Sequence, residues 1–264
     1  MEQLALLGSL SDTALLLGLS TTRVAVAFLL VPLFTAELIP ALIRNALFVS
    51  IALLGLLVQP LPHVGPLNGW QWVTLYAKEA FIGAAIGFLF AGMMWAFEAA
   101  GQVIDNKIGA TQSRLQDPLS GEQTSLNGAF LGRLASYVFM SGGGFMLMIG
   151  TMVESFGIWP VGQPIARFAS GGREFFTGEF GRIMLLTVLI SAPAIVLLYV
   201  IDGVLGLVNR FAQQLNVFSL SMALKGTAGV WIILVQLTAL VQLLQDDLLK
   251  RGSYAIEALR HLLG

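Results

Sequence analysis

Long apolar segments separated by short polar connectors dominate the chain, and they predict an all-helical protein. Several segments approach or exceed the roughly 20 apolar residues with which a helix spans a bilayer. They cover residues 12–34, 41–58, 70–104, 124–153, 183–209 and 217–244. The pattern therefore predicts an all-α, membrane-associated protein built from kinked helices and helical hairpins.

Local signals predict where these helices start, bend or stop. Ser11 or Asp12 is a possible N-cap of the first helix, since both side chains accept hydrogen bonds from free backbone N–H groups. Pro32 and Pro40 bracket a short break, because proline lacks an N–H and clashes with the preceding turn. The glycine run 142–144 predicts a kink, since glycine disfavours a helix interior.

The C-terminal half predicts a connector, a hairpin and a tail. Residues 154–182 form a mixed connector with an amphipathic piece. The stretches 183–209 and 217–244 are joined by a short turn, which is typical of two antiparallel helices. Residues 245–264 alternate charged and apolar positions, which predicts an amphipathic end helix.

A polar stretch at 101–123 interrupts this apolar pattern and is the first candidate for function. It contains five charged residues: Asp105, Lys107, Arg114, Asp117 and Glu122. Charge at membrane depth is costly and usually faces an aqueous cavity or a protein partner. Asp117-Pro118 followed by Gly121 is typical of a turn.

Helical spacing places three polar side chains on one face as the chain enters this stretch. Glu98, Gln102 and Asp105 fall at positions i, i+4 and i+7. The face is either a hydrophilic stripe along a conduit or a helix end that reaches water. Just upstream, Gly83 and Gly87 have the four-residue spacing that permits close helix approach. That seam packs either within the chain or against another subunit.

The hairpin predicts an ion pair. Asp202 and Lys225 lie at nearly equal distances from a turn centred near Gln213, so antiparallel helices bring them to one depth. A pair would offset the desolvation of each charge. In the alternative arrangement, each residue pairs with a different subunit.

Composition narrows the class of protein. Hydrophobic residues make up 56% of the chain and charged residues only 11%, too few to cover a soluble surface. The net charge of −1 gives no sign of a nucleic-acid partner.

There is no cysteine, and His63 and His261 lack partners at ligand spacing, so we expect no metal or cofactor. Asp105 and Asp117 are a weak signal for an aspartyl pair, and no other catalytic set is visible.

The polar stretch GQVIDNKIGATQSRLQDPLSGEQ resembles the signature of the T subunit of the type III secretion export apparatus (the SctT family, with FliR as its flagellar counterpart). Its form is closer to the virulence-type branch. The resemblance spans nearly the whole chain. Its other matching positions are Arg23, Pro32, Pro40, Arg44, Glu79, Gly83, Gly87, Pro193, Asp202, Gly206, Arg210 and the run QLNVFSLSMALK at 214–225. The chain departs from the family at Gln213 and Ala223, where proline is usual.

The resemblance implies a fold and partners. Residues 1–180 would be similar to the R subunit, 181–250 would be an S-like helical hairpin, and 251–264 an amphipathic tail. One such subunit would join R and S subunits in a gate in the bacterial inner membrane, raised toward the periplasm. The U switch subunit, the large export-ring subunit, membrane lipid and secreted proteins in transit would be further partners. The chain would not be an enzyme. The energy for protein export would come from other parts of the secretion apparatus.

The resemblance also implies a loop at about 105–123 that plugs the closed channel. The expected plug residues are Asp105, Asn106, Lys107, Gly109, Arg114, Asp117, Pro118 and Gly121. The expected assembly residues are Gly83, Gly87, Asp202 and Lys225. Deleting 106–121 should then make a resting gate leak small ions. The alternatives are a secondary transporter with its substrate site at the polar break and, less well supported, an intramembrane enzyme.

Overall fold

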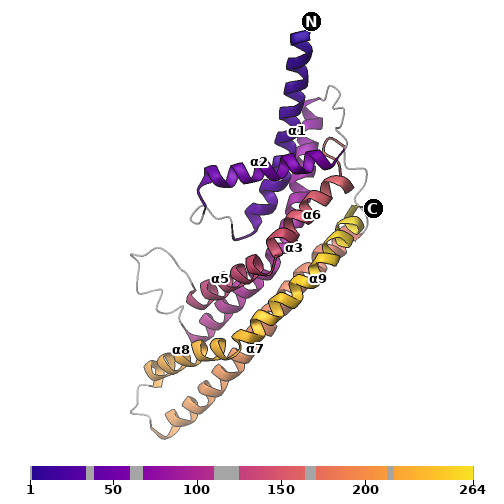
Figure 1. Cartoon of the computed structure of the whole chain (residues 1–264). Helices are drawn as coiled ribbons and strands as arrows, with labels where there is room; N and C mark the ends of the chain where they lie inside the picture. The colour runs from indigo at the N-terminus through magenta and orange to yellow at the C-terminus, as the bar shows by residue number, and fades with distance from the viewer. Residues whose placement is uncertain are drawn as a thin grey trace. The chain divides into compact units, whose positions relative to one another are not determined.

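The computed structural model describes residues 2–33, 39–59, 68–109, 125–163, 171–212 and 217–263, and the regular structure in these ranges is helical (Figure 1). The helices are α1 (Glu2–Leu30), α2 (Ala41–Val58), α3 (Gly69–Ile108), α5 (Leu126–Ser141), α6 (Gly144–Ile158), α7 (Gly171–Phe211), α8 (Val217–Val235) and α9 (Leu237–Leu263). The predicted all-α class is confirmed.

Membrane-spanning potential is concentrated in a few of these helices. Four of them, α2, α3, α7 and α8, are long and apolar enough to cross a bilayer, and the bent pair α5–α6 would make five. The bend between α5 and α6 is 68° and falls at Gly143, whose φ is +82°. A residue with a side chain rarely adopts that backbone conformation. The kink predicted from the glycine run is confirmed.

Helix boundaries differ from the predictions in three places. α1 begins at Glu2, so Ser11 and Asp12 lie inside the helix and do not cap it, because the preceding residues also favour helix. The connector predicted at 154–182 is shorter, since α6 continues to Ile158 and α7 begins at Gly171. The predicted second arm at 217–244 is divided between α8, which ends at Val235, and α9, which starts at Leu237 and also contains the predicted tail.

The chain forms two compact units. Unit 1 comprises residues 1–92, 140–179 and 248–264, and unit 2 comprises 93–139 and 180–247. The helices α3, α5, α7 and α9 therefore contribute residues to both units. The predicted division at 180 and 250 concerns likeness to two other subunits and stays a prediction.

In unit 1, α1 and the first half of α3 approach so closely that only glycine fits between them. A Cβ on Gly83 would lie 2.3 Å from the carbonyl oxygen of Arg23, and one on Gly87 would lie 2.7 Å from that of Ala27. Both glycines are buried. The small-residue seam thus packs within the chain, which is the first of the two alternatives. The role of Gly83 and Gly87 in subunit assembly stays a prediction.

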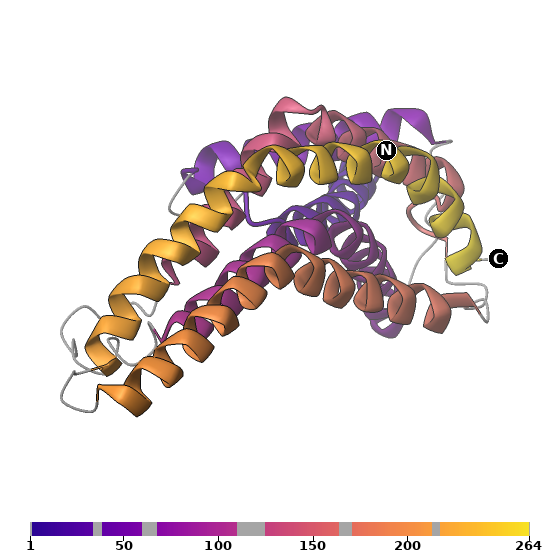
Figure 2. The ribbon, with the colours of Figure 1, turned by 90° about the horizontal axis from the view of Figure 1, so that it is seen from below.

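In unit 2, the second half of α3 is contacted by α5, α7 and α8. α7 (orange) runs beside α3 (magenta), and the hydroxyl of Thr187 lies 3.4 Å from the carbonyl oxygen of Ala96 (Figure 2). The start of α5 touches α3 at Gly101, and α8 touches it where Gly229 meets Ile108. This arrangement places the C-terminal end of α3, where the predicted plug begins, at the centre of unit 2.

Candidate functional site

The first residues of the predicted plug belong to a helix. α3 continues to Ile108, so Asp105, Asn106 and Lys107 lie on its last turns. The helix ends at Gly109, whose φ is +92° and whose N–H lies 3.2 Å from the carbonyl oxygens of Asp105 and Asn106. The predicted start of the loop at 105 is therefore too early, because these side chains are held by neighbouring helices. The remaining plug residues, Arg114, Asp117, Pro118 and Gly121, lie outside the described residues.

A buried carboxylate joins the two ends of this segment. Asp105 accepts hydrogen bonds from the hydroxyl of Ser125, from the backbone N–H of Asn127 at 3.0 Å, and from the side-chain amide of Asn127. Ser125 in turn caps α5, its oxygen accepting the N–H of Gly128 at 3.0 Å. A negative charge is favourable at a helix N-terminus. We call Asp105, Ser125 and Asn127 the neck, because they fix both ends of residues 110–124 at one place.

The neck depends on a close approach of two backbones. A Cβ on Gly101 would lie 2.4 Å from the carbonyl oxygen of Asn127 and from the nitrogen of Gly128. Real Cβ atoms do not come this near to backbone atoms, so only glycine lets the start of α5 reach Asp105. Sequence reasoning missed both Gly101 and the neck.

A charged cluster lies on the side of α3 that faces α7. The carboxylate of Asp202 is 3.0 Å from the ammonium groups of both Lys107 and Lys225. The predicted Asp202–Lys225 ion pair is present within the chain. Lys107 was not foreseen as a partner, since it was assigned to the plug, and its ammonium group also lies 3.7 Å from the ring centre of Tyr199. The three side chains keep part of their surface exposed, 32% in the case of Asp202.

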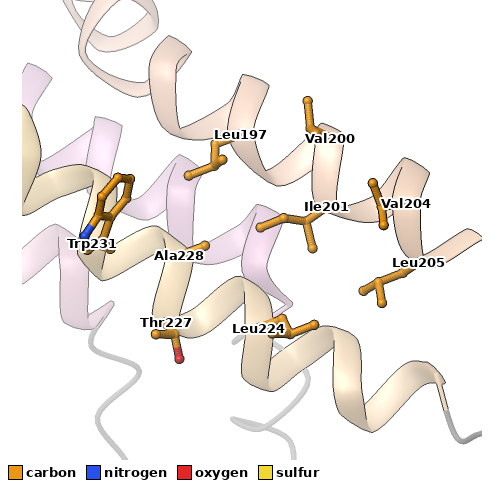
Figure 3. Close-up of a pocket in the computed structure, with 9 residues that line it drawn as sticks. All are labelled: Leu197, Val200, Ile201, Val204, Leu205, Leu224, Thr227, Ala228 and Trp231. Atoms are coloured by element: carbon orange, nitrogen blue, oxygen red, sulfur yellow. The ribbon is translucent and has the colours of Figure 1, made fainter.

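An open apolar groove of about 450 Å³ runs between α7 and α8 (Figure 3). Its lining residues recur every three or four positions along each helix, so they form one face of α7 and one face of α8. Asp202 and Lys225 are not among them. The nine lining residues are Leu197, Val200, Ile201, Val204, Leu205, Leu224, Thr227, Ala228 and Trp231.

Unit 1 contains a second ionic cluster, which is fully buried. The Nε of Arg23 is 2.6 Å from one carboxylate oxygen of Glu79, and the ammonium group of Lys78 is 2.8 Å from the other. Arg23 and Glu79 have no exposed side-chain surface, and Lys78 has 3%. Two cations thus share one buried anion, and a buried charge is tolerated only when it is paired and hydrogen-bonded.

The end of α6 completes this cluster. Arg23 donates to the hydroxyl of Ser155 at 3.1 Å and to the carbonyl of Trp159 at 2.8 Å. Lys78 donates to the carbonyls of Pro160 and Gln163 at 3.0 and 2.8 Å. The carbonyls of Pro160 and Gln163 lie just beyond the end of α6, and their partial negative charge offsets the second cation. The cluster therefore fastens α1, α3 and the end of α6 to one another.

Replacing Asp105 with alanine is expected to loosen the neck. The substitution leaves the hydroxyl of Ser125 and the amide groups of Asn127 buried without their acceptor, which costs about 1–3 kcal/mol. Limited proteolysis of the membrane-embedded chain measures the effect, and cleavage near α5 should become faster. Asn106→Ala, one residue away on an exposed position, is the control and should leave the cleavage rate unchanged.

The described residues contain no group of three or more His, Asp or Glu side chains placed to hold a metal ion. Asp117, the second member of the weak aspartyl pair, lies outside them. The chemistry that the described residues present is thus ionic pairing and apolar contact.

Comparison with known proteins places the chain in a family. A family model described as "Bacterial export proteins, family 1" matches residues 14–250. The "Yop proteins translocation protein T" of Yersinia pestis is 30% identical over 217 residues, covering 81% of this chain and 82% of the relative. The "Secretion system apparatus protein SsaT" of Salmonella typhimurium is 33% identical over 218 residues, covering 81% of each.

A flagellar protein is similar over a still longer range. The "Flagellar biosynthetic protein FliR" of Bacillus subtilis is 26% identical over 242 residues, covering 91% of this chain and 92% of the relative. Both the secretion and the flagellar likeness inferred from the polar stretch and the C-terminal run are thereby confirmed. The chain belongs to the bacterial export proteins of family 1, the family of the type III secretion T subunit and of FliR.

Proposed function

We propose that the chain is a core subunit of a type III secretion export gate, which helps to form and to plug an inner-membrane channel for unfolded proteins. The observation that carries the proposal is the neck. Asp105 binds Ser125 and Asn127, so a polar segment leaves and re-enters a set of apolar helices at one point. A segment held in this way can be displaced from a lumen while the helices around it keep their places.

Family membership and hydropathy support the proposal that the chain is a membrane-embedded gate subunit. Relatives are named for translocation, for a secretion apparatus and for flagellar biosynthesis, which favours a gate subunit over a secondary transporter. Four to five helices have the length and composition of membrane spans. The gate would contain R and S subunits with one copy of this chain, in contact with the U switch subunit and the export ring. The chain itself would catalyse no reaction.

The apolar surfaces of unit 2 are consistent with such an assembly. Only 11% of the most apolar window of α8 is buried within the chain, compared with 72% for α3. The uncovered face of α8 must therefore meet lipid or another apolar helix. Asp202 and Lys225 would hold α7 and α8 in register for that contact. In this proposal, 1–180 is the R-like part, 181–250 the S-like hairpin and 251–264 the tail.

The plug itself can be tested without disturbing the helices. The structure argues against the deletion of 106–121, because it would also remove Lys107, an ion-pair partner of Asp202. We therefore replace residues 110–123 with a short glycine-serine linker, which keeps α3, Gly109 and the neck. In cells that assemble the gate without substrate, this variant should conduct small ions, measured as an inward leak or as single-channel current in bilayers.

A matched control changes a different connector. Replacing residues 60–67 with a linker leaves the polar segment in place and should give no leak. Equal conductance of the 110–123 variant and the unchanged chain, with both assembled to the same extent, would rule out the plug role.

A further inference from the structure

A line of polar residues follows the second half of α3 beside its contact with α5. Gln102 and Asn106 are exposed, and Glu98 is half-buried. The three residues are spaced four apart, so they lie along one line on the helix. The side-chain amide of Gln102 donates to Glu98 at 3.3 Å. We call Glu98, Gln102 and Asn106 the polar edge.

Within unit 2, the other sides of α3 are occupied. Gly101 and Asp105 face the start of α5, and Lys107 faces α7 through Asp202. The side chains of Ile104 and Ile108 lie against Gly229 of α8. The polar edge borders α5, because a Cβ on Gly132 would lie 3.5 Å from the Cβ of Glu98 and a Cβ on Gly128 would lie 3.0 Å from the Cγ of Gln102. Gln102 and Asn106 nevertheless keep exposed surface beside α5.

The polar edge is unusual among the exposed surfaces of this chain. α3 contains a window with a mean hydropathy of 1.9, and the exposed faces of α7 carry residues such as Leu185, Val188 and Val196. Carboxylate and amide groups on a helix this apolar do not face lipid, because hydrocarbon cannot satisfy their hydrogen bonds. They face water or a partner that supplies polar groups. Since the edge leads directly to the polar segment at Gly109, water is the simpler neighbour.

We propose that the polar edge lines the water-filled passage next to the segment that closes it, and that the carboxylate of Glu98 makes this part of the passage favour cations. This inference rests on the proposed gate function and names the wall of the passage. Glu98 has no cation among the ion pairs of the described residues, so its charge is available to the lumen. Coulomb attraction from one carboxylate at short range raises the local concentration of small cations.

The chain contains no cysteine, which allows single-cysteine labelling without background from this subunit. Gln102→Cys and Asn106→Cys report on the polar edge. Val196→Cys, at an apolar position that is 63% exposed, is the control. Each variant is assembled with its gate partners in native membranes and treated with a membrane-impermeant methanethiosulfonate, either cationic or anionic, and labelling is read by mass. Co-purification with the other gate subunits verifies assembly.

The expected result is rapid labelling at positions 102 and 106 and little at 196. After each rate is divided by that reagent's rate with a free thiol in solution, the cationic reagent should react about threefold to tenfold faster than the anionic one, given one charge at a few ångströms in screened water. Glu98→Gln should remove most of this difference without lowering assembly. In the variant with residues 110–123 replaced, labelling at 102 should also reduce the leak current.

Two results would overturn the inference. One is equally slow labelling at 102, 106 and 196, which would mean that a partner protein or lipid covers the polar edge. The other is rapid labelling at the same normalised rate with both reagents, which would rule out the attraction of cations by Glu98. Labelling is scored independently of current, so labelled cysteines in a variant that never conducts would refute the gate function but not the water-facing edge.

Discussion

Glu79→Gln is expected to prevent stable accumulation of the chain. Glu79 is the single carboxylate in the buried cluster, and its loss leaves Arg23 and Lys78 without a counter-charge in the core of unit 1. Breaking a buried ion pair by removing one partner typically costs about 3–5 kcal/mol. Folded proteins are stable by only about 5–15 kcal/mol, so most of the available stability is lost.

The measurement is the amount of chain that co-purifies with its gate partners, together with the thermal unfolding midpoint of what is recovered. Glu98→Gln is the matched control, since it makes the same change on the same helix at a half-buried position. It should alter stability by less than about 0.5 kcal/mol. Full recovery of Glu79→Gln with an unchanged midpoint would show that the cluster does not stabilise unit 1.

Gly101→Ala is expected to separate α5 from α3 at the neck. The added methyl group would lie 2.4 Å from two backbone atoms of α5, and backbone cannot move aside as a flexible side chain can. Overpacking usually costs about 1–3 kcal/mol, and here the shift also lengthens the hydrogen bonds to Asp105. We expect a lower unfolding midpoint and, in the assembled gate, a resting leak smaller than that of the 110–123 replacement.

Gly203→Ala tests whether this effect comes from contact or from helix propensity. Gly203 lies within α7, and a Cβ there meets nothing within 4 Å among the residues that the structure describes. Alanine is favoured over glycine in helices by about 1 kcal/mol, so this variant should be as stable as the unchanged chain or more stable. A similar loss of stability in both variants would contradict the packing argument.

Features that depend on local spacing could be predicted from the sequence. The bend at Gly143 follows from a glycine run, and the Asp202–Lys225 pair follows from counting residues on either side of a turn. The bounds of α2 match the predicted 41–58 because proline precedes the helix and follows it closely. A few neighbouring residues determine the bend and the bounds of α2. The ion pair needs only one short turn, which brings two helices side by side.

Features that join distant helices could not be predicted in this way. The partners in the buried cluster, Arg23 and Glu79, are 56 positions apart, and their meeting depends on how α1 packs on α3. An arginine in one apolar stretch and a Lys-Glu pair in another each need a charge partner, but their positions in the sequence do not indicate which one. The family resemblance places Asp105 at the start of a loop, although α3 continues past it to Ile108.

The neck has a consequence for how this part of the chain can vary. Because one carboxylate ties the last turns of α3 to the first turn of α5, the alignment of these helices does not depend on the residues between them. Insertions or deletions there change loop length, which adds only about 0.6 kcal/mol of closure entropy for each doubling. The residues between α3 and α5 can therefore be exchanged for those of a related export protein without changing how the two helices align.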